Sequence, residues 1–120
     1  MSAATNTIDQ SANDLPDDKR IQGTWEIELS EHNGQPHSKA VWTFDGEKMI
    51  SRPNRAVGGE ATWVIKLDPK QKHIDISTYP GIYAFDGEKL KIAYRLGGAR
   101  PTELKSDAET YYCELAKVKE

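Results

Sequence analysis

The sequence predicts an all-β protein, a small antiparallel up-and-down β-barrel of about eight strands with a short helical turn before it. The first observation is a repeat, because Phe44-Asp45-Gly46-Glu47-Lys48 recurs as Phe85-Asp86-Gly87-Glu88-Lys89. An Asp-Gly pair between two apolar-rich runs predicts a β-hairpin, since both residues tolerate the positive φ of a tight turn. The second observation is a series of short alternating runs at a spacing of about 8–12 residues, which is typical of a sandwich or barrel. Up-and-down connections favour the barrel, because closure removes exposed sheet edges.

The N-terminal part of the chain differs from the rest. Residues 1–13 are mostly Ser, Ala, Thr, Asn, Asp and Gln and predict a disordered tail. We expect the barrel domain over residues 14–120. Asp14 is the expected cap of one or two helical turns, with Pro16 in the first turn and acidic residues near the positive end. No other helix of any length is expected.

From Gln22 onward the apolar residues recur with period two. In the first strand Trp25, Ile27 and Leu29 alternate with glutamates, which predicts a half-buried strand. The later strands are expected near residues 40–45, 47–52, 62–67, 74–78, 82–85, 88–95 and 111–118. Turns are expected at residues 33–36, 53–59, 68–71 and 97–98, and Pro80-Gly81 is expected to break the chain between two strands.

The register of the two hairpins decides which side chains face inward. If each Asp-Gly pair forms a two-residue loop, Tyr83 faces Leu90 and Trp42 faces Met49. The expected interior is then Trp25, Trp42, Phe44, Trp63, Tyr83, Phe85, Leu90, Ile92 and Tyr94. A three-residue bulged turn would shift the register by one and turn part of this set outward.

Composition excludes several classes of protein. A chain of 120 residues suggests one domain, and its net charge of −3 offers no basic surface for nucleic acid or for a polybasic membrane contact. No apolar run reaches the ~20 residues that span a bilayer. One cysteine excludes an internal disulfide. The N-terminus lacks the apolar region of a secretory signal, which predicts a cytoplasmic protein; an exported mature domain given a starting Met is the alternative. The oligomeric state stays open.

The start of the first strand carries a resemblance. Gln22-Gly23-Thr24-Trp25-Glu26 resembles the Gly-x-Trp start of lipocalins and their calycin relatives. More specifically, the chain is similar to a lipocalin-like domain family of unknown function that is best known from planctomycete genomes. The motifs that match are Ile21 to Trp25, Phe44 to Lys48, Lys66 to Pro69, Ile74 to Ile76, Gly81 to Tyr83, Phe85 to Leu90 and Arg100 to Leu104. They keep the family's order from about residue 15 to residue 118.

The resemblance implies a lipocalin-like barrel and brings no assigned activity. It also implies that a basic side chain of the last strand lies over Trp25. Lys117 or Lys119 would supply it, because a cation is attracted to the face of an indole ring and would close that end of the barrel.

Few residues carry a signal for metal binding or catalysis. His32, His37 and His73 show no metal-ligand spacing and are expected to be exposed, so no metal is expected. Cys113 is expected to be a small buried packing residue. We find no nucleophile elbow, no phosphate-binding glycine loop and no zinc-protease motif, and therefore expect no catalytic residues and no cofactor.

Our first functional hypothesis is a non-enzymatic module that binds a small apolar or amphipathic ligand inside the barrel. The expected ligand-binding residues are Trp42, Trp63, Tyr83 and Tyr94 in an aromatic interior, with Arg52 and Arg100 near strand ends. The arginines would either orient a carboxylate or phosphate of the ligand or form surface salt bridges. A cavity of a few hundred Å³ would favour this hypothesis over a filled core.

Two other hypotheses stay open. The alternative is a solid-core interaction or scaffold domain that acts through its outer surface, and an exposed apolar patch of Ile82 with Val41 and Ile50 would favour it. The third is an enzyme that uses the barrel mouth. It would need a buried, coupled pair of titratable groups, and the sequence does not present one.

Overall fold

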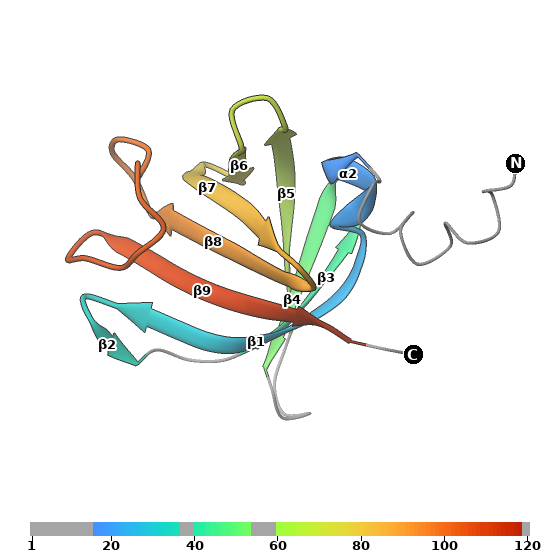
Figure 1. Cartoon of the computed structure of the whole chain (residues 1–120), viewed down its shortest axis with the longest axis horizontal. Helices are drawn as coiled ribbons and strands as arrows, with labels where there is room; N and C mark the ends of the chain where they lie inside the picture. The colour runs from blue at the N-terminus through green and yellow to red at the C-terminus, as the bar shows by residue number, and fades with distance from the viewer. Residues whose placement is uncertain (1–15, 37–39, 54–59, 119–120) are drawn as a thin grey trace, which may run out of the picture.

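The computed structural model of the chain describes residues 16–36, 40–53 and 60–118 and consists almost entirely of β-strands (Figure 1). The elements follow in the order α2 (Asp17–Arg20), β1 (Gly23–His32), β2 (Gln35–Pro36), β3 (Ala40–Asp45), β4 (Lys48–Pro53), β5 (Ala61–Asp68), β6 (His73–Ile76), β7 (Tyr79–Asp86), β8 (Lys89–Arg95) and β9 (Thr110–Lys117). The predicted tail over residues 1–13 lies outside the described residues. In those ranges, no helix has the length and apolar character needed to cross a membrane.

Eight strands form a closed antiparallel barrel, and the short strand β2 is added beside β1. From β3 to β9 each strand pairs with the next one along the chain, and β9 then pairs with β1. The closing ladder extends from Trp25↔Lys117 to His32↔Tyr111. This closure confirms the predicted up-and-down barrel and joins the two strands that would otherwise be sheet edges.

The two repeated hairpins turn over Gly-Glu and not over Asp-Gly. The Asp and Lys of each repeat are paired with each other, as Asp45↔Lys48 and Asp86↔Lys89. Gly46 and Gly87 therefore occupy the first central position of a two-residue turn, with φ of 66° and 62°. A type II′ turn requires such a positive φ at this position, which glycine adopts without a steric cost.

This turn changes the predicted pairs but not the predicted faces. Leu90 pairs with Phe85 and not with Tyr83, which lies two residues earlier in β7. In the same way Met49 pairs with Phe44 and not with Trp42. The predicted pairs are wrong because Asp joins the strand. Since the shift is by two residues, every side chain keeps its side of the sheet.

A bulge in β1 interrupts the predicted alternation. The β1–β9 register shifts between Ile27 and Leu29. Trp25 and Ile27 are buried as expected, but Leu29 is 37% exposed and Ser30 is buried in its place. An extra residue in one strand moves all later side chains to the opposite face, so the predicted alternation is wrong after Ile27.

Two predicted strand boundaries are also wrong. The expected turn over residues 33–36 is shorter, because Gln35 pairs with His32 and Pro36 pairs with Glu31 to form the β1–β2 hairpin. Pro80-Gly81 does not break the chain but lies inside β7. The break comes earlier, where Ser77 adopts a φ of 57° between β6 and β7.

One cluster of buried apolar side chains forms the core inside the barrel. The buried apolar side chains are Ile21, Trp25, Ile27, Trp42, Phe44, Met49, Ile65, Ile74, Ile76, Tyr83, Leu90, Ile92, Cys113 and Leu115, with Trp63, Phe85 and Tyr94 packed against them half-buried. All members of the interior set expected from the sequence belong to this cluster. Each strand of the closed barrel contributes through the alternation of its inward positions.

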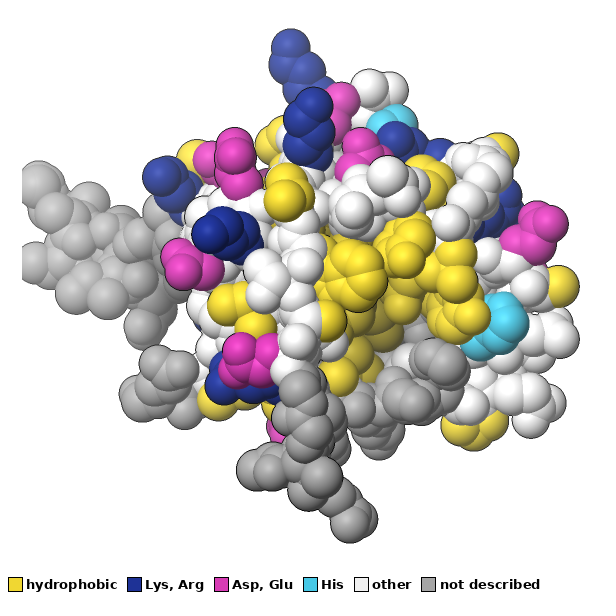
Figure 2. Space-filling model, turned by 180° about the vertical axis from the view of Figure 1, so that it is seen from behind, with side chains coloured by type: hydrophobic (Ala, Val, Ile, Leu, Met, Phe, Trp, Pro, Cys, Tyr) yellow, Lys and Arg dark blue, Asp and Glu magenta, His cyan; other side chains and the backbone are white. Residues whose placement is uncertain are grey.

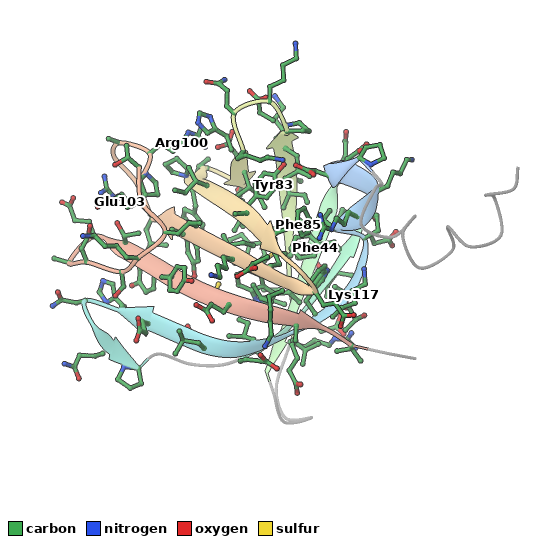
Figure 3. The ribbon with its side chains drawn as sticks, in the orientation of Figure 1. Phe44, Tyr83, Phe85, Arg100, Glu103 and Lys117 are labelled. Atoms are coloured by element: carbon green, nitrogen blue, oxygen red, sulfur yellow. The ribbon has the colours of Figure 1, made fainter. Side chains whose placement is uncertain are left out.

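The short helix α2 covers one end of this core. Its N-cap is Pro16, which was expected in the first turn, and Asp17 and Asp18 lie in the first turn as predicted; the expected cap Asp14 lies outside the described residues. The Asp17 carboxylate accepts hydrogen bonds of 2.6 Å from Lys72 Nζ and from the Tyr83 hydroxyl. In Figure 3 Tyr83, Phe85 and Phe44 lie toward α2, at the right of the barrel. These contacts fix α2 to β7.

Candidate functional site: the open barrel mouth

The end of the barrel opposite α2 contains a hollow of about 280 Å³. Among the described residues its lining is Trp42, Met49, Ser51, Trp63, Ile76, Tyr79, Tyr94, Leu96 and Tyr111. Figure 2 shows hydrophobic side chains gathered in a broad hollowed area on one face of the molecule. At the α2 end the interior holds fully buried side chains such as Ile21 and Leu90, and a groove of about 520 Å³ lies beside α2. We call this the filled end of the barrel, and the opposite end is open.

Strand alternation explains why these side chains meet. Trp42 on β3 and Trp63 on β5 occupy inward positions, and Met49 and Ser51 lie two residues apart on β4 between them. Tyr79 begins β7, and Tyr94 and Tyr111 lie near the β8–β9 connection, where they pair with each other. Each strand thus brings an inward residue to the same end of the barrel.

The aromatic rings form two groups in the hollow. In the first group Trp63 and Tyr79 have ring centres 5.5 Å apart and planes inclined by 50°. In the second group Trp42 and Tyr94 have centres 6.4 Å apart and planes inclined by 55°. Inclined ring pairs at these separations are favourable packing geometries, so the rings within each group stabilise each other's positions.

Tyr111 supports the second group from behind. Its ring stacks on Tyr94 at 5.4 Å with an interplanar angle of 14°, and on His32 at 4.1 Å with an angle of 8°. His32 Nε2 also lies 3.0 Å from the Ala108 carbonyl oxygen. Tyr111 is thus enclosed between two nearly parallel rings, which hold it and Tyr94 in place.

Four aromatic side chains of the hollow carry polar groups that a ligand can contact. No hydrogen bond within the described residues joins the indole N–H groups of Trp42 and Trp63 or the hydroxyls of Tyr79 and Tyr94, and none of these atoms is buried without a partner. Burial raises the pKa of Tyr94 far above its ordinary value of 10.0, so its hydroxyl is neutral. These groups can donate hydrogen bonds from an otherwise apolar wall.

The structure brings together three of the predicted ligand-binding residues. Trp42, Trp63 and Tyr94 line the hollow. Tyr83 lies at the other end, only 2% exposed, where its hydroxyl donates to Asp17. Burial first, and the hydrogen bond to Asp17 second, raise the pKa of Tyr83 strongly above its ordinary value of 10.0. Tyr83 therefore has a partner in the packed end of the barrel.

Neither predicted arginine is among the described residues that line the hollow. Arg52 donates from Nη2 to Thr43 Oγ1 at 3.2 Å, and its Nε lies 3.7 Å from a Glu60 carboxylate oxygen. It lies next to the inward Ser51 on β4 and so faces outward.

Arg100 lies on the segment that connects β8 and β9, visible at the left of Figure 3. Its Nη1 donates to the Gly81 carbonyl at 2.9 Å and lies 2.7 Å from an Asp75 carboxylate oxygen. It borders a separate groove of about 500 Å³ with Lys66, His73 and Asp75 among the lining residues. These contacts attach the long connection to β6 and β7.

Sequence reasoning missed Tyr79 and Tyr111 as lining residues. Tyr79 precedes Pro80-Gly81, which was interpreted as a break, although Tyr79 and Gly81 occupy alternate positions of one strand. Tyr111 shares its parity with the buried residues Cys113 and Leu115. This parity was the signal in the sequence that could have identified Tyr111.

The other sequence candidates lie apart from the hollow. Cys113 is 3% exposed, which confirms a buried packing role. His73 is half-buried and alternates with the buried Ile74, as an outward residue does, and His37 lies outside the described residues. No group of three or more histidine, cysteine or acidic side chains suited to a metal ion occurs within residues 16–36, 40–53 and 60–118.

The expected outer patch does not assemble. Val41 and Ile50 lie on the neighbouring strands β3 and β4, whereas Ile82 lies on β7 and pairs with His73 and Ala93. All three side chains are half-buried.

Comparison of the chain with models of protein families, with curated proteins and with solved structures gives no significant match.

Proposed function

We propose that this protein is a non-enzymatic, lipocalin-like binding module that holds a small apolar or amphipathic molecule in the open mouth of the barrel. The observation that carries the proposal is the hollow of about 280 Å³ lined by five aromatic rings, Trp42, Trp63, Tyr79, Tyr94 and Tyr111. Ligand sites are typically concave and mostly apolar, with a few polar groups that orient the ligand.

The volume favours a small ligand. Drug-sized ligands occupy pockets of roughly 300–1,000 Å³, and the hollow lies just below this range at about 280 Å³. An apolar cavity of about 150 Å³ accepts benzene, so the hollow has space for a molecule somewhat larger than one ring. The filled half of the barrel near α2 prevents a long chain from extending through the interior.

Intrinsic fluorescence tests the proposal directly. Two of the chain's three tryptophans, Trp42 and Trp63, line the hollow, whereas Trp25 lies in the filled end. Titration with a panel of small aromatic, aliphatic and amphipathic molecules, neutral and charged, should change the emission for at least one class. The same ligand at about 100 times its Kd should stabilise the fold by about 2.7 kcal/mol, seen as a higher Tm.

A variant and its neighbour make the test specific. Trp63→Leu should weaken binding at least about tenfold, because it removes one wall of the hollow. Val64→Ser is the matched control, since Val64 follows on the same strand, is 62% exposed and faces outward. No change of emission or Tm with any member of the panel would refute the proposal, as would equal losses of affinity in the two variants.

A further inference from the structure

The described residues that line the hollow carry no formal charge. The described residues around it are the five aromatic side chains together with Met49, Ser51, Ile76 and Leu96. Arg52 and Arg100, the side chains expected to attract an anion, are engaged with Glu60 and Asp75 elsewhere. The chain as a whole has a net charge of −3. The described part of the lining therefore presents no cation to a bound anion, and the net charge of the chain favours a positive ligand over a negative one.

The arrangement of the rings suits a compact group better than a flat one. Trp63 and Tyr79 are inclined by 50°, and Trp42 and Tyr94 by 55°, so neither pair forms a parallel slot. The parallel pair, Tyr94 with Tyr111, has centres only 5.4 Å apart. The two tyrosines already contact each other at this separation, and no third ring fits between them.

Aromatic faces attract cations. The face of an indole or phenol ring carries negative charge density, and a cation within about 6 Å of the ring centre is stabilised, most strongly over tryptophan and away from water. The aromatic cages that recognise quaternary ammonium groups place several rings around one cation. Trp42, Trp63, Tyr79 and Tyr94 supply four such rings here, while Tyr111 has both faces covered by Tyr94 and His32.

We propose that the ligand of the hollow is a small organic cation with a compact quaternary ammonium head, held against the rings of Trp42, Trp63, Tyr79 and Tyr94. This inference rests on the proposed ligand-binding function and names the class of ligand. The alkylated head contacts the rings through its methyl groups, and a short polar tail reaches Ser51 or the tyrosine hydroxyls. A hollow of about 280 Å³ has space for such a molecule.

The test compares two probes of nearly the same shape. Choline carries a trimethylammonium head, and 3,3-dimethylbutan-1-ol replaces the charged nitrogen with carbon. We measure the Kd of each by tryptophan fluorescence and by calorimetry at low ionic strength. Choline should bind at least about tenfold more tightly, because the attraction of the rings for the charge is absent from the isostere.

Variants separate the contribution of the aromatic faces to choline affinity from that of apolar contact alone. Tyr79→Leu keeps an apolar side chain but removes the ring, and should weaken choline binding several-fold with little effect on the isostere. Tyr79→Phe retains the ring and should keep most of the affinity. Val64→Ser should bind choline like the unchanged protein. Thermal unfolding of each variant verifies that it is folded.

Four outcomes would overturn the inference. Binding of the isostere as tightly as choline would exclude a preference for the cation. A preference for choline that is unchanged in Tyr79→Leu would exclude a role for the Tyr79 ring in it. In the third outcome a neutral or anionic member of the panel binds more tightly than choline and loses affinity in Trp63→Leu. That result would overturn the proposed class of ligand but uphold the ligand-binding function. Absence of any binding across the whole panel would refute both.

Discussion

The ammonium nitrogen of Lys117 lies 4.8 Å from the centre of the Trp25 ring. Gly23 makes this position possible, because a Cβ at residue 23 would lie 2.9 Å from Lys117 Cε. Lys117 Nζ also donates to the Gln22 carbonyl, and Trp25 Nε1 donates to the Ile21 carbonyl at 2.8 Å. The basic residue that the lipocalin resemblance placed over Trp25 is thus confirmed as Lys117. Its side chain joins the last strand to the segment between α2 and β1.

Removal of this cation should destabilise the fold. Lys117→Ala loses the contact with the Trp25 ring and the hydrogen bond to Gln22, which together stabilise by about 1 kcal/mol. We expect Tm to fall by roughly 3–6 °C in a thermal unfolding experiment. Lys117→Arg should restore most of the loss. Lys105→Ala is the control, since its ion pair with Glu103 is exposed; an equal fall in that variant would contradict a specific role for Lys117.

Gly81 is required by the close approach of three strands. A Cβ there would lie 2.7 Å from the Ala93 carbonyl oxygen and 3.1 Å from that of Ile74, and neither backbone atom can move freely. Gly81→Ala should therefore cost about 1–3 kcal/mol, measured by urea unfolding. Gly97→Ala is the matched control because nothing lies within 4 Å of its added methyl group. Similar midpoints for the two variants would show that the barrel wall relaxes at Gly81.

The contacts of Asp17 predict a loss of stability in acid. Burial alone would raise its pKa, but the hydrogen bonds from Lys72 and Tyr83 outweigh burial and lower the pKa below its ordinary value of 3.8. A carboxylate with a lowered pKa stabilises the fold above the unfolded value, and this contribution disappears as the pH falls through the folded value. The free energy of unfolding should therefore lose this contribution below about pH 4.

Asp17→Asn tests this contribution. It should lower the free energy of unfolding at pH 7 by about 1–2 kcal/mol, because it removes the charge that Lys72 and Tyr83 contact. The difference from the unchanged protein should shrink as the pH falls from 4 to 2. Urea unfolding across this range provides the measurement. A constant difference at all pH values would mean that the Asp17 charge is not responsible.

Cys113 should not react while the protein is folded. Burial first, and the Glu114 carboxylate second, raise the pKa of the thiol far above its ordinary value of 9.0. The thiolate is the reactive form of cysteine, so an alkylating reagent at pH 8 should modify Cys113 only after the barrel unfolds. Mass spectrometry with and without denaturant provides the measurement. Rapid and complete modification in buffer would contradict this burial.

Local sequence patterns predicted the barrel, because each strand and each hairpin depends on residues that are close together in the chain. The repeated Phe-Asp-Gly-Glu-Lys segment identified two hairpins, and alternation placed Trp42, Trp63 and Tyr94 inside. The pairings of Tyr83 and Trp42 were wrong, since the turn could begin at Asp or at Gly without a visible difference in sequence. The faces were nevertheless right, because the shift was an even number of residues.

The membership of the candidate site was only partly predictable. Trp42, Trp63 and Tyr94 line the hollow, whereas Tyr83, with the same inward parity, lies at the filled end. Parity gives the face of a sheet but not the height of a residue along the barrel axis. Arg52 was expected at the mouth although parity excludes it, because it follows the inward Ser51 and therefore faces outward, toward Glu60.

The sequence by itself determined an antiparallel barrel, the aromatic character of its interior and the faces of most strands, because these follow from contacts between residues close in the chain. The tertiary structure decided which end is filled and which is open. The β1 bulge, the β1–β9 register and the position of α2 set the relative heights of distant strands. These heights bring Tyr79, Tyr94 and Tyr111 to one mouth and Lys117 over Trp25 at the other end, and no local pattern encodes them.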